Sequence, residues 1–69
     1  SWACGVDLQP GWHARVRPIL DQFTAYTPGS LIEVKTASIA WHYRNAPEIF
    51  GARQGHELRL LLTAALSNQ

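Results

Sequence analysis

Four ionisable side chains occupy alternating positions in the stretch "IEVKTASIAWHYRNA", residues 32–46. Successive residues of an extended chain point to opposite faces of a sheet, so an extended conformation would bring these side chains to one face. A carboxylate accepts hydrogen bonds, whereas lysine and arginine donate them, and such a mixture can bind a neutral polyol through its hydroxyl groups. The candidate residues of this polar face are Glu33, Lys35, His42 and Arg44.

A solvated sheet surface would explain the same pattern without a ligand. Antiparallel sheets commonly have one face in contact with water. Ion pairs between exposed side chains contribute only about 0–1 kcal/mol each, and they are common on protein surfaces. The residue pattern by itself therefore leaves both interpretations open, a binding surface and a merely hydrated one.

The other residues that could carry out chemistry form no motif. No two of the three histidines have the close spacing of a zinc site. Cys4, the only cysteine, is not supported by a glycine-rich elbow or by paired carboxylates, and phosphate-loop and dinucleotide-binding patterns are absent. We therefore predict no catalytic residue and no metal site. The histidines, which fall on three different predicted elements, are His13, His42 and His56.

Two predicted helices flank the polar stretch. The first covers about residues 10–26, where apolar residues at spacings of four, seven, eight and eleven define one helical face, and Pro18 is expected to bend or split it. The second covers about residues 51–67, and Gly55 inside it costs about 1 kcal/mol relative to alanine. The apolar stripes consist of Trp12, Val16, Ile19, Leu20 and Phe23 in the first helix and of Leu58, Leu61, Leu62, Ala65 and Leu66 in the second.

Two strands are predicted between the helices, over about residues 30–35 and 38–44. With residues 36–37 as the tip of a hairpin, bulky apolar residues face one another across the two strands, and a shift by one residue would reverse their side. The predicted pairs are Val34 with Ile39, Ile32 with Trp41 and Glu33 with Ala40. The apolar face would hold Ile32, Val34, Ile39, Trp41 and Tyr43, whereas Leu31 falls on the polar side.

The predicted fold is α+β, with the order helix, strand, strand, helix (αββα) and both helices packed on one face of the hairpin. Residues 1–11 show no periodicity, so we expect an irregular lead-in followed by one unit over residues 12–69. Two strands are too few to cover two helices of this length well, and an isolated hairpin is marginally stable. The pattern therefore indicates a piece of a larger unit, whose exposed hairpin edge would allow self-association.

Composition argues against several classes of partner. The net charge is +1 and the six lysine and arginine residues are scattered, which disfavours nucleic acid. No apolar run approaches the roughly 20 residues needed to cross a bilayer, and the first residues lack the features of a signal peptide. A single cysteine excludes an internal disulfide and favours a reducing, cytoplasmic setting. We expect neither a nucleic-acid partner nor a membrane partner.

Three motifs follow one another along the chain, "VRPIL", "TPGSLIEVK" and "WHYRNA". Together with the residues between them, over about residues 12–66, they closely resemble the cap region of trehalose-6-phosphate phosphatases, above all the phosphatase part of bifunctional synthase/phosphatase chains. Such phosphatases belong to the haloacid dehalogenase superfamily, in which a Rossmann-like core holds an aspartate nucleophile and Mg²⁺. A mobile α/β cap closes over the substrate. The resemblance implies hydrolysis of trehalose 6-phosphate to trehalose and phosphate.

The resemblance also implies roles for individual residues of the polar face. In the family, the Glu and Lys of "E-x-K" and the Arg of "HYR" belong to the cap surface that grips the sugar. These positions match Glu33, Lys35 and Arg44 in this chain. His42 and Asn45 are adjacent to them and are further candidates for substrate contact.

The chain departs from the family by lacking the motifs of the catalytic core. An acidic nucleophile motif of the D-x-D-G-T kind is absent, and so are the lysine and the second acidic cluster that hold phosphate and metal. The resemblance therefore implies about half of an α/β cap, inactive alone, with Mg²⁺ bound by the catalytic core of the same parent chain. The competing interpretation is an autonomous αββα interaction module that pairs its hairpin edge with a partner strand.

Overall fold

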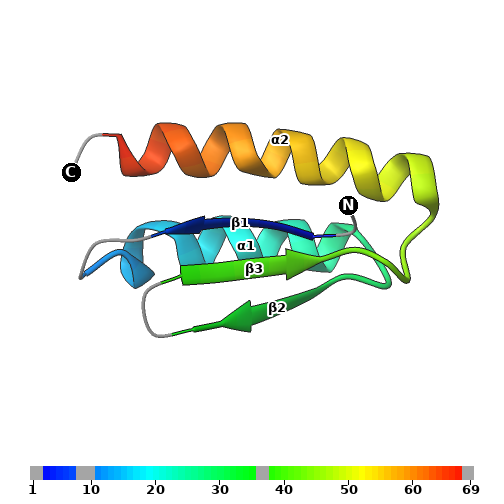
Figure 1. Cartoon of the computed structure of the whole chain (residues 1–69), viewed down its shortest axis with the longest axis horizontal. Helices are drawn as coiled ribbons and strands as arrows, with labels where there is room; N and C mark the ends of the chain where they lie inside the picture. The colour runs from blue at the N-terminus through cyan, green and yellow to red at the C-terminus, as the bar shows by residue number, and fades with distance from the viewer. Residues whose placement is uncertain (1–2, 8–10, 36–37, 68–69) are drawn as a thin grey trace.

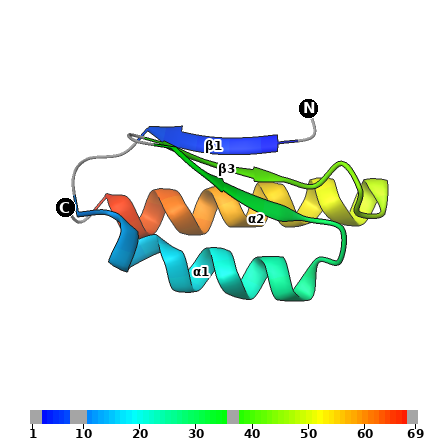
Figure 2. The ribbon, with the colours of Figure 1, turned by 90° about the horizontal axis from the view of Figure 1, so that it is seen from below.

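The computed structural model describes residues 3–7, 11–35 and 38–67 of the chain. The three strands form one antiparallel sheet in the order β1-β3-β2. Both helices lie on one side of this sheet and run antiparallel to each other along the strands (Figures 1 and 2). The elements are, in chain order, β1 (Ala3–Asp7), α1 (His13–Tyr26), β2 (Leu31–Val34), β3 (Ser38–His42) and α2 (Glu48–Leu66).

The hairpin of β2 and β3 has the predicted register, and the αββα arrangement is confirmed. The pairs are Ile32 opposite Trp41, Glu33 opposite Ala40 and Val34 opposite Ile39. Because side chains alternate along a strand, Trp41 and Glu33 belong to opposite faces of the sheet. We call the helix-side face the covered face, with Ile39 and Trp41, and the other face the open face, with Glu33, Ala40 and His42. The hairpin tip, residues 36–37, lies outside the described residues.

β1 is the main correction to the sequence-based prediction. An irregular lead-in was expected over residues 1–11, but Ala3–Asp7 form a strand that pairs antiparallel with β3, with Cys4 opposite Trp41 and Val6 opposite Ile39. The segment has little alternation of its own, and its pairing with a strand far away along the chain makes it extended. β3 is therefore the central strand, and β1 covers the hairpin edge that was expected to be open.

α1 packs its predicted apolar stripe into the core. Trp12, Val16 and Leu20 are buried, and other members of the stripe pack partly against them. α1 continues through Pro18 as one helix, so the split into two helices does not occur. The proline is exposed and lies inside α1, where it removes the N–H that would donate to the Ala14 carbonyl.

α2 begins earlier than predicted, at Glu48, directly after Pro47. The Gly51 N–H donates to the Pro47 carbonyl at 2.7 Å, which closes the first turn, and an acidic residue in this turn suits the helix dipole. Leu58 and Leu62 of the predicted stripe are buried. Within the described part of the chain, neither helix is long and apolar enough to cross a membrane.

Two residues predicted for the core are exposed instead. Leu61 is 46% exposed, because the buried side of α2 is centred on Leu58 and Leu62 and Leu61 lies on its flank. Val34 lies at the end of an outer strand and is also exposed. The remaining apolar hairpin residues behave as predicted: Ile39 and Trp41 are buried, and Ile32 and Tyr43 pack partly against the core.

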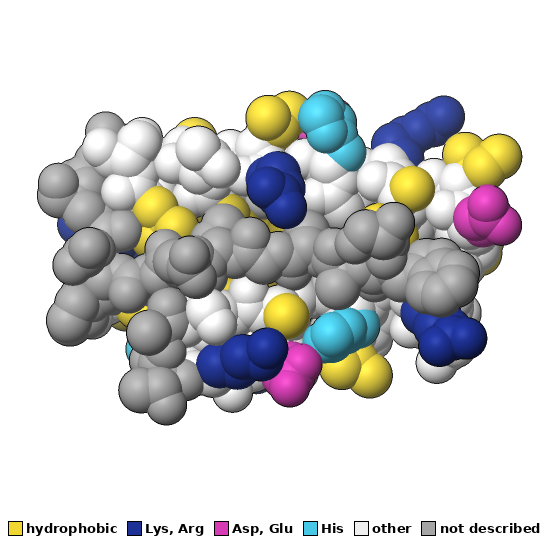
Figure 3. All heavy atoms as spheres, viewed as in Figure 1, with side chains coloured by type: hydrophobic (Ala, Val, Ile, Leu, Met, Phe, Trp, Pro, Cys, Tyr) yellow, Lys and Arg dark blue, Asp and Glu magenta, His cyan; other side chains and the backbone are white. Residues whose placement is uncertain are grey.

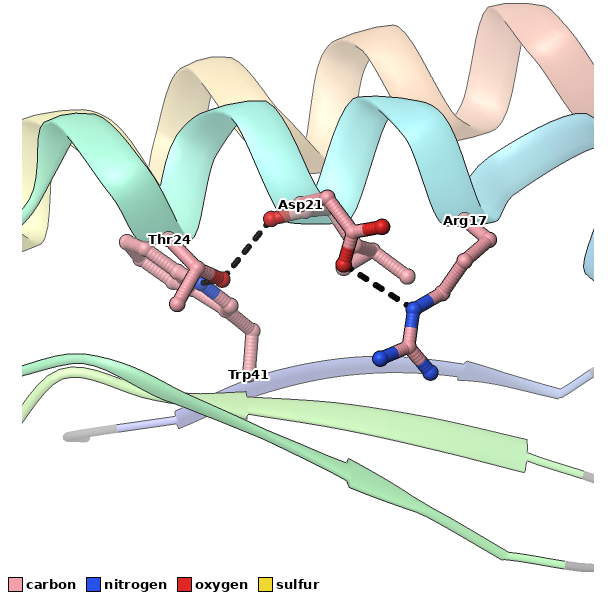
Figure 4. A network of polar contacts seen from close by, with 5 residues as sticks. Arg17, Asp21, Thr24 and Trp41 are labelled. Atoms are coloured by element: carbon pink, nitrogen blue, oxygen red, sulfur yellow. Dashed lines mark hydrogen bonds and ion pairs between the residues drawn. The ribbon is translucent and has the colours of Figure 1, made fainter.

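Hydrogen bonds hold the buried tryptophan of β3 against α1 (Figure 4). The Trp41 indole N–H donates to Thr24 Oγ1 at 3.1 Å, and the Thr24 hydroxyl donates to the Leu20 carbonyl at 2.7 Å. The Phe23 ring lies edge-on to Trp41, with centroids 6.4 Å apart. The covered face of the central strand is therefore fixed by packing and by satisfied polar groups.

Candidate functional site

The open face collects its polar side chains from β2 and β3. Glu33 lies within β2, and His42 lies at the end of β3 opposite Leu31, so Glu33 and His42 are diagonal neighbours across the hairpin. Lys35 directly follows β2, and its N–H donates to the Ser38 carbonyl at 2.9 Å, which extends the strand pairing by one bond. Figure 3 views this side of the sheet and shows a basic, an acidic and a histidine side chain in a row along its lower part.

Glu33 and His42 are in direct contact. Nε2 of His42 lies 2.7 Å from Oε1 of Glu33, and the side chains are 39% and 50% exposed, respectively. This distance suits an imidazole N–H that donates to an ionised carboxylate. A carboxylate offers about four acceptor positions, so one imidazole does not saturate it.

The surroundings of Glu33 favour its ionised form. The hydrogen bond from His42 and then the positive charge of Lys35 lower the pKa of the Glu33 carboxyl below its ordinary value. At neutral pH the side chain is therefore a carboxylate that accepts hydrogen bonds and donates none. Its neighbours on the open face supply the complementary donors.

Arg44 and Asn45 lie in the turn between β3 and α2. The Ala46 N–H donates to the Tyr43 carbonyl at 3.0 Å, so residues 43–46 form a turn with Arg44 and Asn45 at its two central positions. Both central side chains are exposed. The structure thus brings Glu33 and His42 into contact and places Arg44 and Asn45 in the turn that directly follows His42.

Leu31 is a member of the open face that sequence reasoning set aside. It is the exception to the apolar alternation of the hairpin, and it lies opposite His42 with about half of its surface exposed. An apolar side chain beside charged ones gives the face a mixed character. The signal that identifies Leu31 is its place in the strand register, which pairs it with a polar partner.

The open face does not have the composition of a Mg²⁺ site. Mg²⁺ prefers oxygen ligands in near-octahedral geometry, whereas this face combines one carboxylate with cationic side chains and an imidazole. Among the residues that the structure describes, no group of three or more His, Cys, Asp or Glu side chains is suited to hold a metal ion. We assign no metal-dependent step to these residues.

The arrangement is suited to the recognition of hydroxyl groups. Glu33 accepts hydrogen bonds, and the side chains of Lys35 and Arg44 donate them. These groups are exposed, so water competes for each bond and the interactions are individually weak. A binding partner that covers the face would strengthen them by excluding that water.

A family model described as trehalose-phosphatase matches residues 3–69, a range that includes β1. Alpha,alpha-trehalose-phosphate synthase [UDP-forming] A of Dictyostelium discoideum is 49% identical over 51 residues, which are 74% of this chain and 7% of the relative. A bifunctional trehalose-6-phosphate synthase/phosphatase of Thermoproteus tenax is 39% identical over 67 residues, 97% of this chain and 9% of the relative. No solved structure matches the chain significantly.

A trehalose-phosphatase of Saccharomyces cerevisiae is 40% identical over 48 residues, 70% of this chain and 5% of the relative. The chain thus spans less than a tenth of the length of these three relatives. The family resemblance that was based on three short motifs is confirmed over nearly the whole chain. This chain belongs to the trehalose-phosphatase family.

Proposed function

We propose that this chain is part of the substrate-recognition cap of a phosphatase that hydrolyses trehalose 6-phosphate in trehalose biosynthesis. Its open face is the surface that binds the sugar. The nucleophile and Mg²⁺ belong, in this proposal, to a haloacid dehalogenase-type catalytic core in the same parent chain. The 69 residues alone are inactive, because phosphoryl transfer needs a nucleophile and charge stabilisation of the transferred group.

The observation that supports the proposal best is the Glu33–His42 pair. An ionised carboxylate lies on an exposed sheet face, 2.7 Å from one donor, with acceptor capacity left for a ligand. The family membership supports a sugar phosphate as the ligand, since several relatives are named for trehalose phosphate.

In the proposed complex, Glu33 accepts hydrogen bonds from glucose hydroxyls. Lys35 and Arg44 donate to other hydroxyls, and His42 and Asn45 are the secondary candidates for contact. Closure of the cap on its core would exclude water, which strengthens these bonds and shields the phosphoryl transfer. The cap thereby contributes specificity, and the core contributes the chemistry.

The test uses the complete protein that contains this segment. Glu33→Gln, Lys35→Ala and Arg44→Ala are each assayed on trehalose 6-phosphate and on para-nitrophenyl phosphate, a plain ester too small to need the cap. Loss of a hydrogen bond to a charged group should lower kcat/KM for trehalose 6-phosphate by about ten- to a hundred-fold. The activity on the plain ester should change little.

Glu57→Gln is the matched control, because Glu57 is an exposed glutamate on α2, away from the open face. It should leave both activities unchanged. Equal losses on both substrates for Glu33→Gln would mean that the substitution damaged the fold or the core. No loss on either substrate would mean that the open face is only hydrated, and the proposal would be abandoned.

The interaction-module interpretation has less support, because β1 occupies one edge of the hairpin. Self-association through a strand edge stays a prediction, and the outer strands are its candidates. Light scattering on the chain at high concentration tests it. A strictly monomeric species would exclude such pairing.

A further inference from the structure

Gly29 lies in the loop before β2 and allows this loop to approach the backbone of the turn 43–46 closely. Gly29 has a φ of +95°, a conformation that favours glycine. A Cβ atom at this position would collide with the Asn45 carbonyl and would lie 2.7 Å from the Ala46 nitrogen. The loop that ends α1 therefore presses directly on the centre of the turn that carries Arg44 and Asn45.

Two glycines of α2 lie against Tyr43, the first residue of the same turn. A Cβ at Gly51 would lie 3.0 Å from Cδ2 of Tyr43, and a Cβ at Gly55 would lie 3.0 Å from Cε1 of the same ring. The glycines are four residues apart, so they share one face of the helix and form a seat for the ring. Tyr43 also packs against Trp41, with ring centroids 5.7 Å apart.

The seat explains why two poor helix formers lie on the buried side of α2. Glycine is less favourable in a helix interior than any residue except proline. Here both glycines are buried, and any larger residue would press on the Tyr43 ring. The Tyr43 ring fixes the start of the turn, and buried Ala46 fixes its end. Between them, the loop at Gly29 lies directly against the Asn45 carbonyl.

We propose that Tyr43, Gly29, Gly51 and Gly55 are positioning residues for the sugar site. They hold the turn in the conformation in which Arg44 and Glu33 contact the same ligand. The role assigned to Arg44 rests on the proposed function, whereas the restraint of the turn rests on these contacts alone. The experiment therefore needs one readout for the restraint of the turn and one for the role of Arg44.

The first readout is limited proteolysis of the complete protein, because a turn held in one conformation should be cleaved by trypsin after Arg44 more slowly than a turn that opens. The cleavage rate at this bond, followed by mass spectrometry, should rise about tenfold or more in Gly29→Ala, because the added methyl group would collide with the Asn45 carbonyl and displace the turn. Gly11→Ala is the matched control. Gly11 also has a positive φ, +86°, but a Cβ there would meet nothing within 4 Å. It should leave the Arg44 cleavage rate unchanged.

The second readout is a double-mutant cycle in KM for trehalose 6-phosphate. Gly55→Ala should raise KM several-fold, with little change in kcat and none for the plain ester. In an Arg44→Ala background, Gly55→Ala should have almost no further effect, because the contact that it disturbs is already absent. Tyr43→Phe keeps the ring and should raise KM much less than Tyr43→Ala does.

Faster cleavage in Gly29→Ala together with non-additive KM effects would support the inference. Unchanged cleavage, or equal effects of Gly55→Ala with and without Arg44, would overturn it. Failure of the proposed function is recognised separately, because Glu33→Gln would then show no selective loss. The proteolysis result does not depend on that outcome.

Discussion

The two sides of β3 lie in different environments. One side is buried against the helices, the other is in contact with water, and each carries a different polar contact. On the covered face, Trp41 is 1% exposed and its indole N–H is satisfied by Thr24 inside the protein. On the open face, the adjacent residues Glu33 and His42 form a hydrogen bond of 2.7 Å, and both side chains remain in contact with water. The same strand therefore supplies both a sealed polar contact and one that a ligand can reach.

This difference separates stability from recognition. Changes on the covered face should lower the stability of the unit and thereby affect every substrate equally. Substitutions on the open face should leave the stability almost unchanged and should weaken only the recognition of the sugar. The following predictions test that separation, beginning with the largest expected effect.

Trp41→Ala should have the largest effect on folding. Truncation of a fully buried aromatic residue typically costs about 3–5 kcal/mol, a large part of the stability of a small domain. Urea unfolding of the chain, followed by circular dichroism, measures the loss. Ala40→Ser lies on the same strand but on the open face, and it should cost little. Similar losses for both variants would contradict the assignment of the two faces.

Leu62→Ala and Leu61→Ala compare two neighbouring positions of α2. Leu62 is 2% exposed and Leu61 is 46% exposed. Truncation of the buried leucine should lower the free energy of unfolding by about 2–5 kcal/mol, whereas truncation of the exposed one should cost less than about 1 kcal/mol. A reversed order would show that Leu61, as the sequence pattern predicts, belongs to the core.

Thr24→Val removes the hydroxyl that accepts from Trp41 and keeps the shape of the side chain. The buried indole N–H then has no acceptor, which typically costs about 1–3 kcal/mol. Thr63→Val, at an exposed position of α2, is the matched control and should be close to neutral. The free energies of unfolding of the two variants, measured in urea, provide the comparison. Equal effects would mean that the bond to Trp41 contributes nothing measurable.

The smallest effect should come from the ionisation of Glu33. Its pKa is lowered in the folded chain by the His42 hydrogen bond and by Lys35, so the folded state binds this proton less tightly than the unfolded state. The stabilisation is therefore present above the ordinary glutamate pKa of about 4.3 and is lost as the pH falls through the folded value.

The Tm difference between the unmodified chain and Glu33→Gln should be small at pH 7, because the pair is exposed to solvent. It should shrink toward pH 3. In a His42→Ala background the pH-dependent part should be smaller still. A Tm difference that grows on acidification would contradict the direction of the pKa shift.

The elements that depend on local periodicity were predictable from the sequence. The register of β2 and β3 follows from alternation, since a slip would have exposed Trp41 and buried Glu33. The buried stripe of α1 follows from its helical spacing. Grouping Glu33 and His42 on one face needed no more than this register.

Features that depend on distant partners were not predictable in the same way. β1 is extended because β3 pairs with it, and its own residues show no alternation. The exposure of Leu61 depends on which side of α2 meets the sheet. The glycine seat of Tyr43 depends on how the turn packs on α2, so Gly55 gave no signal beyond its cost to the helix.

The central claim is that the open face binds the sugar, and a crystal structure of the complete protein with trehalose tests it most directly. The account predicts a glucose hydroxyl within hydrogen-bond distance of the Glu33 carboxylate, about 2.5–3.0 Å, with Lys35 or Arg44 bound to a neighbouring hydroxyl. Trehalose bound elsewhere, with Glu33 in contact with His42 alone and β2 and β3 remote from the sugar, would contradict it.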